Sequence, residues 1–145
     1  MTNDKLTVAV VGLGYIGLPT AAIIARSGCE VIGVDVSADV VETINRGDIH
    51  IEEVDLDGLV QAVVARGTLK ASTQMPVADV YVVAVPTPFE KDGEHTPDTG
   101  YVMAAADAIA PVLRPGALVI CESTCPVGTT DALRDRLAAL RSDLA

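Results

Sequence analysis

Three glycines follow the first hydrophobic run of the chain, in the segment Gly12-Leu13-Gly14-Tyr15-Ile16-Gly17. The run before them, residues 6–11, predicts a strand, and the residues after them predict a helix. In such a unit the first glycine permits a tight turn, the second lets the backbone touch a pyrophosphate, and the third lets helix and strand pack closely. The free amides at the helix start favour an anion. This context predicts a dinucleotide-binding turn rather than a structural glycine turn.

An acidic residue, Asp35, stands at the end of the second predicted strand, 18 positions after Gly17. A carboxylate at that place can accept hydrogen bonds from both hydroxyls of an adenosine ribose, and it would repel a 2′-phosphate. The position therefore favours NAD over NADP. The alternative is that Asp35 only caps the following helix, which Ser37 could also cap.

Two loops rich in proline and threonine follow the fourth and fifth predicted strands, at residues 85–88 and 122–130. Ligands of open α/β sheets gather beyond the carboxyl ends of the strands. The prolines would fix the loops so that the hydroxyls of Thr87 and Thr124 point the same way. Composition alone, however, favours ordinary turn chemistry for both loops.

The elements that must position these residues alternate between short buried strands and amphipathic helices. Strands are predicted at residues 6–11, 31–34, 69–71, 80–85 and 117–121. Helices are predicted from the glycine turn to Ser27, at 37–46, at 55–66, from Asp98 or Thr99, and from Thr130, the last with Leu133, Leu137, Leu140 and Leu144 inward. The pattern predicts an α/β fold, a Rossmann-type doubly wound parallel sheet with helices on both faces.

One domain, residues 1–145, is expected, because no repeat or linker divides the chain. No segment of the sequence predicts the sixth strand of a complete fold of this kind, so this strand is expected to be missing and the chain to be a fragment. The fifth strand would then form an exposed apolar edge that is prone to self-association.

Composition and charge exclude several classes of partner. The chain carries 20 acidic and 10 basic residues and 3% aromatic residues, which argues against nucleic acids and anionic lipid. Residues 6–25 are uncharged, but glycines and Pro19 interrupt them, so no membrane span is expected. Three cysteines, an odd number without metal spacing, suit a reducing cytoplasm. His50 and His95 are expected at the surface, and no metal site is expected.

The motifs together resemble the N-terminal, NAD-binding domain of the UDP-glucose/GDP-mannose dehydrogenase superfamily. The resemblance covers essentially the whole chain and rests on residues 12–19, Asp35, 45–47, 85–88 and 122–129. Within the superfamily, residues 49–52 (IHIE) and 84–89 (AVPTPF) most resemble the bacterial UDP-N-acetyl-D-mannosamine dehydrogenase branch. Val54 departs from the usual proline after the glutamate that Glu53 matches, and this affects only the local loop.

The resemblance implies a four-electron oxidation, in which a primary alcohol of a UDP-sugar becomes a carboxylate through two hydride transfers to NAD. It assigns cofactor contacts to Tyr15, Ile16, Asp35, Thr87 and Thr124, in addition to Gly12, Gly14 and Gly17. It also places Thr124 nearest the nicotinamide and the water that hydrolyses the thioester intermediate.

The family's catalytic cysteine, lysine, asparagine and aspartate lie in later segments, so no catalytic residue is expected here. Cys29, Cys121 and Cys125 are interpreted as packing residues. The central helix and the UDP-sugar-binding domain are not present in this chain, which is expected to bind NAD without turnover. The full-length protein is expected to be a cytoplasmic homodimer that acts in polysaccharide biosynthesis.

Two alternatives remain open. The chain could be a free-standing module that senses NAD or mediates an interaction without catalysis, which its length favours. It could also belong to another dehydrogenase of the same cofactor fold, such as a hydroxyacid enzyme, although the two proline-threonine loops argue against that.

Overall fold

The strands predicted from the sequence are all present in the computed structural model, which describes residues 5–91 and 93–145. They are β1 (Thr7–Val11), β2 (Glu30–Val34), β3 (Leu69–Ser72), β4 (Val80–Val83) and β5 (Leu118–Cys121). The α-helices of this part of the chain are α1 (Gly17–Arg26), α2 (Ala38–Asn45), α3 (Leu56–Ala65), α4 (Gly100–Ile109) and α5 (Thr129–Leu140). A short 3-10 helix, Ala110–Val112, continues α4.

The strands form one parallel sheet in the order β3-β2-β1-β4-β5. The chain starts in the middle at β1, builds outward through β2 and β3, and then crosses to β4 on the other side of β1. Val8 consequently lies in register with both Val31 and Val80. Such a reversal creates a crevice at the carboxyl ends of the two central strands. The predicted doubly wound sheet is confirmed.

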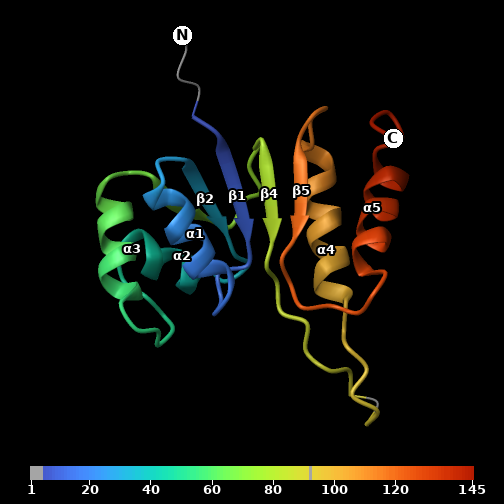
Figure 1. Cartoon of the computed structure of the whole chain (residues 1–145), viewed down its shortest axis with the longest axis horizontal. Coiled ribbons are helices and arrows are strands. Elements are labelled where there is room, and N and C mark those ends of the chain that lie inside the picture. Colours follow the sequence, from blue (N-terminus) through green and yellow to red (C-terminus); the bar gives the residue numbers. More distant parts are fainter. Residues whose placement is uncertain (1–4, 92) are drawn as a thin grey trace.

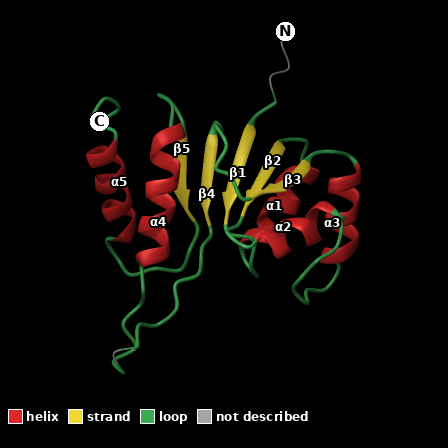
Figure 2. Cartoon of the chain, turned by 180° about the vertical axis from the view of Figure 1, so that it is seen from behind, coloured by secondary structure: helices red, strands yellow, loops and turns green. Residues whose placement is uncertain are grey.

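Helices cover both faces of the sheet and enclose two apolar cores. Side chains alternate between the faces of a strand, so Val8 and Val10 of β1 pack with α1, α2 and α3, whereas Ala9 and Val11 pack with α4 and α5. In Figure 1 α1 lies in front of the sheet, and in Figure 2, seen from behind, α4 lies in front of it. Central strands that are buried on both faces explain the uncharged valine-rich sequences of β1 and β4.

Three local predictions were wrong. β4 ends at Val83 rather than at residue 85, because the chain leaves the sheet before its first loop proline. Asp55 precedes α3 in the left-handed conformation (φ 63°), so the helix begins one residue later than predicted. Leu140 is 45% exposed, unlike the buried Leu133 and Leu137, because α5 ends at Leu140 and the chain turns away at Arg141. Leu144 therefore lies beyond the helix and not on its inward face.

β5 forms the predicted edge of the sheet, and its Leu118 and Ile120 are 56% and 42% exposed. Their register with Val80 and Val82 places them on the face that α1 covers farther along the sheet. Self-association through this edge stays a prediction. Within residues 5–91 and 93–145, no helix is long and apolar enough to cross a membrane.

Candidate cofactor site

The glycine turn, residues 12–17, joins β1 to α1 at the carboxyl edge of the sheet. Gly12 has a φ of 96°, and its amide donates a hydrogen bond of 2.8 Å to the carbonyl oxygen of Val34 in β2. A Cβ at Gly12 would lie 2.6 Å from the carbonyl oxygen of Ala84. A glycine is therefore required here both by the backbone angle and by the close approach of the chain after β4.

The other two glycines differ sharply in what surrounds them. A Cβ on Gly17 would lie 1.7 Å from the carbonyl oxygen of Gly12, so this glycine lets α1 begin directly against the turn. A Cβ on Gly14 would meet nothing within 4 Å. The packing of the chain itself thus explains Gly12 and Gly17 but not Gly14, which faces open space where a ligand can approach the backbone.

The amino terminus of α1 is free to bind an anion. No side chain caps it, and its first turn contains no acidic residue. The Leu18 and Thr20 amides already donate to the Gly14 and Ile16 carbonyl oxygens at 3.0 Å and 3.2 Å, and Pro19 has no amide hydrogen. The helix dipole and the amides before Leu18 are therefore the groups that attract negative charge. Tyr15 and Ile16, which precede the helix, are 63% and 55% exposed. The residues present therefore fit a phosphate or pyrophosphate group.

Asp35 follows β2 with its carboxylate held in a fixed orientation. Its Oδ2 accepts a hydrogen bond of 3.0 Å from the Leu13 amide, and its Oδ1 accepts one of 2.9 Å from the Ser37 amide. The cap of α2 is Ser37, whose Oγ accepts a hydrogen bond of 3.4 Å from the Val40 amide. The interpretation of Asp35 as the helix cap is therefore wrong. A carboxylate has about four lone-pair sites, so two remain for ligand hydroxyls.

A cavity of about 300 Å³ lies beside Asp35, and its walls are mainly apolar. Several of its lining residues were missed by the sequence analysis, namely Val36, Thr73, Met75, Tyr101, Ala104, Ala105 and Ala108. Val36 is 100% exposed, which leaves a valine side chain uncovered next to the carboxylate. The signal that could have found Val36, Thr73 and Met75 is their position just after β2 and β3. The cavity suits a flat apolar ring system attached to a sugar that Asp35 holds.

The structure brings Thr87 and Thr124 together from loops 37 residues apart in the sequence. The Thr87 hydroxyl donates to the carbonyl oxygen of Thr124, and the two hydroxyl oxygens are 3.3 Å apart. The Ser123 hydroxyl donates to the Val85 carbonyl oxygen at 2.8 Å, which further joins the loop after β5 to the loop after β4. The Thr87 hydroxyl is therefore directed at the loop after β5, and the common direction of the two threonine hydroxyls stays a prediction.

A side-chain hydrogen bond of 2.7 Å from Thr20 Oγ1 to Glu122 Oε1 connects α1 to the loop after β5. The glycine turn, Asp35 and the threonine loops all follow carboxyl ends of strands, which point the same way in Figure 1. The carboxyl ends of the strands thus carry, in sequence order, the backbone amides of the glycine turn, the Asp35 carboxylate and the threonine hydroxyls. These groups lie on both sides of the crevice between β1 and β4. Such a set can bind an extended dinucleotide without any basic side chain.

The remaining candidate residues lie as follows. Cys29 packs against the core below α1, and Cys121 packs against the core below α4, as expected. Cys125 belongs to neither core, so its interpretation as a packing residue was wrong. His50 and His95 are exposed, as predicted, and the His95 ring meets Phe89 edge-on with centroids 5.0 Å apart. Among the described residues, no group of three or more His, Cys, Asp or Glu side chains could hold a metal ion.

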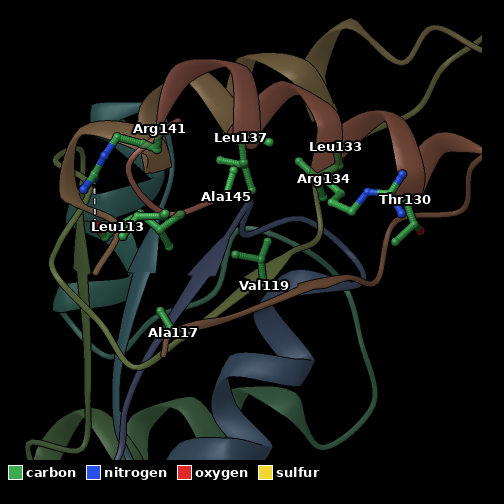
Figure 3. A pocket seen from close by; sticks show the side chains of 11 residues that line it. Leu113, Ala117, Val119, Thr130, Leu133, Arg134, Leu137, Arg141 and Ala145 are labelled. Atoms are coloured by element: carbon green, nitrogen blue, oxygen red, sulfur yellow. Dashed lines mark hydrogen bonds between the residues drawn. The ribbon is translucent and has the colours of Figure 1, made fainter. Parts of the chain in front are cut away.

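A second cavity of about 300 Å³ lies between β5 and α5 (Figure 3). Its walls are largely apolar, with Val119, Leu133 and Leu137 in the middle. At one end the Arg141 guanidinium donates hydrogen bonds of 2.7 Å and 2.8 Å to the carbonyl oxygens of Leu113 and Ala110. None of the predicted cofactor residues lines this cavity, so it is separate from the site at the carboxyl edge.

Comparison with known proteins gives a consistent result. Residues 6–144 match the family model described as the NAD binding domain of the UDP-glucose/GDP-mannose dehydrogenase family. The chain is 55% identical over 142 residues to the NDP-N-acetyl-D-galactosaminuronic acid dehydrogenase of Ralstonia nicotianae, covering 98% of this chain and 33% of that protein. It is also 55% identical over 138 residues to the UDP-N-acetyl-D-mannosamine dehydrogenase of Escherichia coli K12, covering 95% of this chain and 32% of that protein.

The fold comparison agrees. The structure of a UDP-N-acetyl-D-mannosamine dehydrogenase from Pyrococcus horikoshii superposes with a TM-score of 0.89 at 39% identity, over 94% of this chain and 33% of that one. The chain therefore spans about a third of the length of the relatives that it matches.

Proposed function

Because the chain belongs to the UDP-glucose/GDP-mannose dehydrogenase family and is its NAD-binding domain, we propose that NAD binds along the carboxyl edge of the sheet. The pyrophosphate lies over Gly14 at the start of α1, beside Tyr15 and Ile16. The adenosine ribose binds to Asp35, and the adenine occupies the cavity beside it. The nicotinamide end points toward Thr87 and Thr124, on the far side of the crevice.

The contrast among the three glycines carries this proposal. Gly12 and Gly17 are accounted for by contacts within the chain, whereas Gly14 leaves open space next to an uncapped helix terminus. Other glycines of the chain, such as Gly28 and Gly67, also face open space, so it is the position of Gly14 at the carboxyl edge of the sheet, where ligands collect, that favours a ligand. The second fixed point is the Asp35 carboxylate, which two backbone amides orient while leaving part of it free.

The chemistry of the complete enzyme is proposed to be oxidation of the primary alcohol of a UDP-N-acetylhexosamine to a carboxylate. Bound NAD supplies the hydride acceptor. Residues of this chain bind and orient that acceptor, and the hydroxyl pair of Thr87 and Thr124 positions a water molecule beside it. We favour UDP-N-acetyl-D-mannosamine as the sugar substrate, on the likeness of residues 49–52 and 84–89 to that branch.

Residues 1–145 are proposed to act as the cofactor domain of a longer enzyme. The relatives are about three times as long as this chain, and the sugar site and the catalytic thiol are proposed to lie in the part that this chain does not include. None of the three cysteines described here lies among the proposed cofactor contacts. A homodimer and a cytoplasmic location are proposed for the complete enzyme, the latter supported by three free thiols.

Calorimetric titration of the chain with NAD and NADP tests the cofactor proposal. We expect NAD to bind and NADP to bind at least about tenfold more weakly, because a 2′-phosphate would meet the Asp35 carboxylate (~1.4 kcal/mol). Asp35→Asn should weaken NAD binding by about tenfold and reduce the preference over NADP. Asp39→Asn removes the same charge from an exposed position and should change neither affinity. Equal binding of both dinucleotides, or equal effects of the two substitutions, would contradict the assignment.

A further inference from the structure

Two cysteines meet directly beneath the proposed nicotinamide end of the site. Cys121 is the last residue of β5, and Cys125 lies four residues later in the loop. Their Sγ atoms are 3.6 Å apart, and both side chains are partly buried. A disulfide needs sulfur atoms about 2.05 Å apart, so the two must approach by ~1.5 Å, which a loop residue can supply.

The two thiols differ in their surroundings. Burial raises the pKa of Cys121 to about 11, and the hydrogen bond and charge of Cys125 contribute in the same direction. Cys121 is therefore a protonated thiol at neutral pH and a poor first nucleophile. Cys125 lies in the loop, where its Sγ is 3.1 Å from the Ser123 carbonyl oxygen, and it packs against neither core. Cys125 is consequently the thiol that an oxidant reaches first.

We propose that Cys121 and Cys125 form a reversible disulfide when the chain meets a peroxide, and that this bond displaces Thr124. The Cys125 thiolate attacks one oxygen of hydrogen peroxide, the O–O bond breaks, and the departing hydroxide takes up a proton to become water. The Cys121 sulfur then attacks the resulting sulfenic acid, a second water leaves, and the S–S bond forms. Two thiols are oxidised by two electrons and one peroxide is reduced to two waters.

The consequence for the site follows from what lies between the two cysteines. Thr124 directly precedes Cys125, and its carbonyl oxygen accepts the hydrogen bond from Thr87. Ser123 is fixed to the end of β4 and to the loop after it, through the carbonyl oxygens of Val83 and Val85 at 3.3 Å and 2.8 Å. Because Cys121 is held in the sheet and Ser123 is held to the neighbouring strand, Cys125 and Thr124 are the residues that move. This effect on the cofactor site rests on the proposed function, whereas the disulfide itself does not.

Mass spectrometry of the peroxide-treated chain tests the disulfide. Trypsin does not cleave before Pro115, so both cysteines fall in the peptide of residues 92–134, whereas Cys29 falls in another. We expect this peptide to lose the mass of two hydrogen atoms and to regain it with dithiothreitol. Cys121→Ser and Cys125→Ser should each abolish the loss, and Cys29→Ser should retain it. Oxygen addition at Cys125 without the hydrogen loss, or a bond through Cys29, would overturn the proposal.

Two further measurements separate the disulfide from the cofactor assignment. Oxidation should shift the amide NMR signals of Thr87 and Thr124 and leave that of Asp35 unchanged, with or without NAD. It should also weaken NAD binding by about threefold to tenfold, the range of one lost hydrogen bond, and this change should be absent in Cys125→Ser. A disulfide that leaves the threonine signals unmoved would disprove the coupling. If the reduced chain binds no NAD, the proposed function fails while the mass and NMR results still decide this inference.

Discussion

At the scale of single residues, the glycine turn shows how three identical side chains come to have different roles. The sequence motif predicts a tight turn, a ligand approach and a close packing contact, in that order. The structure supports the first and third through contacts with the Ala84 and Gly12 carbonyl oxygens. A Cβ at the middle glycine, Gly14, would meet nothing within 4 Å, so the role of a side chain at that position can be separated experimentally from folding.

The first prediction concerns Gly14→Val. The new side chain would fill the open space in front of the α1 amides, so NAD affinity should fall by at least about tenfold (~1.4 kcal/mol). The free energy of unfolding should change by less than about 0.5 kcal/mol, as for an ordinary surface substitution. Calorimetric titration and thermal unfolding measure the two quantities.

Gly17→Ala provides the opposite control. Its Cβ would overlap the Gly12 carbonyl oxygen, and backbone atoms cannot yield as side chains do. We expect destabilisation by about 3 kcal/mol or more, at the upper end of overpacking costs. Equal stability losses in Gly14→Val and Gly17→Ala would show that the turn, and not a ligand, requires Gly14.

The raised pKa of Cys121 predicts a pH dependence of stability. The pKa of this thiol is about 11 in the folded chain and 9.0 without burial. Between these values the unfolded chain has lost the proton and the folded chain has kept it, so the free energy of unfolding falls as the pH rises from 9 to 11. Denaturant titrations in the presence of a reductant, at pH 8 to 11, would measure the slope. Cys121→Ser should reduce the slope but not remove it, because burial also raises the pKa of Tyr81. An unchanged slope would contradict the argument.

At the scale of elements, the hydrophobic pattern predicts every strand and the side of the sheet on which function lies. The spacing of apolar residues along the chain predicts which side chains face a core. The central strands of a parallel sheet are uncharged because they are buried on both faces. The cavity beside Asp35 was missed for a different reason. Val36, Thr73 and Tyr101 come from three separate segments, and only the packing of α4 against the strand ends brings them together. No pattern within a single segment of the sequence predicts that these three segments line one cavity.

A contact between α2 and β3 gives a prediction at this scale. β3 is an edge strand, and the Asn45 side chain of α2 supplies the partner that its backbone lacks there. Its Nδ2 donates to the Ala71 carbonyl oxygen at 3.0 Å, and its Oδ1 accepts from the Ala71 amide at 2.8 Å. Asn45→Leu removes both bonds and should cost about 2 kcal/mol, or roughly 4–8 °C in Tm.

Two variants make this measurement specific. Asn45→Asp keeps the shape but loses the donor and places a carboxylate beside a carbonyl oxygen, so it should destabilise at least as much as Asn45→Leu. Glu42→Gln lies on the same helix in an exposed ion pair with Arg46 and should change the stability by less than about 0.5 kcal/mol. If Asn45→Asp is as stable as the native chain, the paired hydrogen bonds do not stabilise the edge.

At the scale of the whole molecule, a strongly acidic chain is proposed to bind an anionic dinucleotide. The formal net charge is -10, and the proposed site uses backbone amides and a helix dipole in place of basic side chains. Two electrostatic effects therefore act over different ranges. The amides attract the pyrophosphate at contact distance, whereas the net charge of the surface repels the approaching ligand from farther away.

Salt separates these two effects, because the screening length shortens from about 30 Å at 0.01 M to about 10 Å at 0.1 M ionic strength. Raising the salt concentration over that range should weaken the long-range repulsion and leave the contact interactions nearly unchanged. We therefore expect the association rate of the dinucleotide, measured by stopped-flow with the fluorescence of its reduced form NADH, to rise with salt while the dissociation rate stays nearly constant. Neutralising exposed acids away from the site, as in a combined Glu42→Gln and Asp143→Asn variant, should reduce this salt dependence. An association rate that falls with salt would mean that basic side chains, rather than the open end of α1, capture the phosphates.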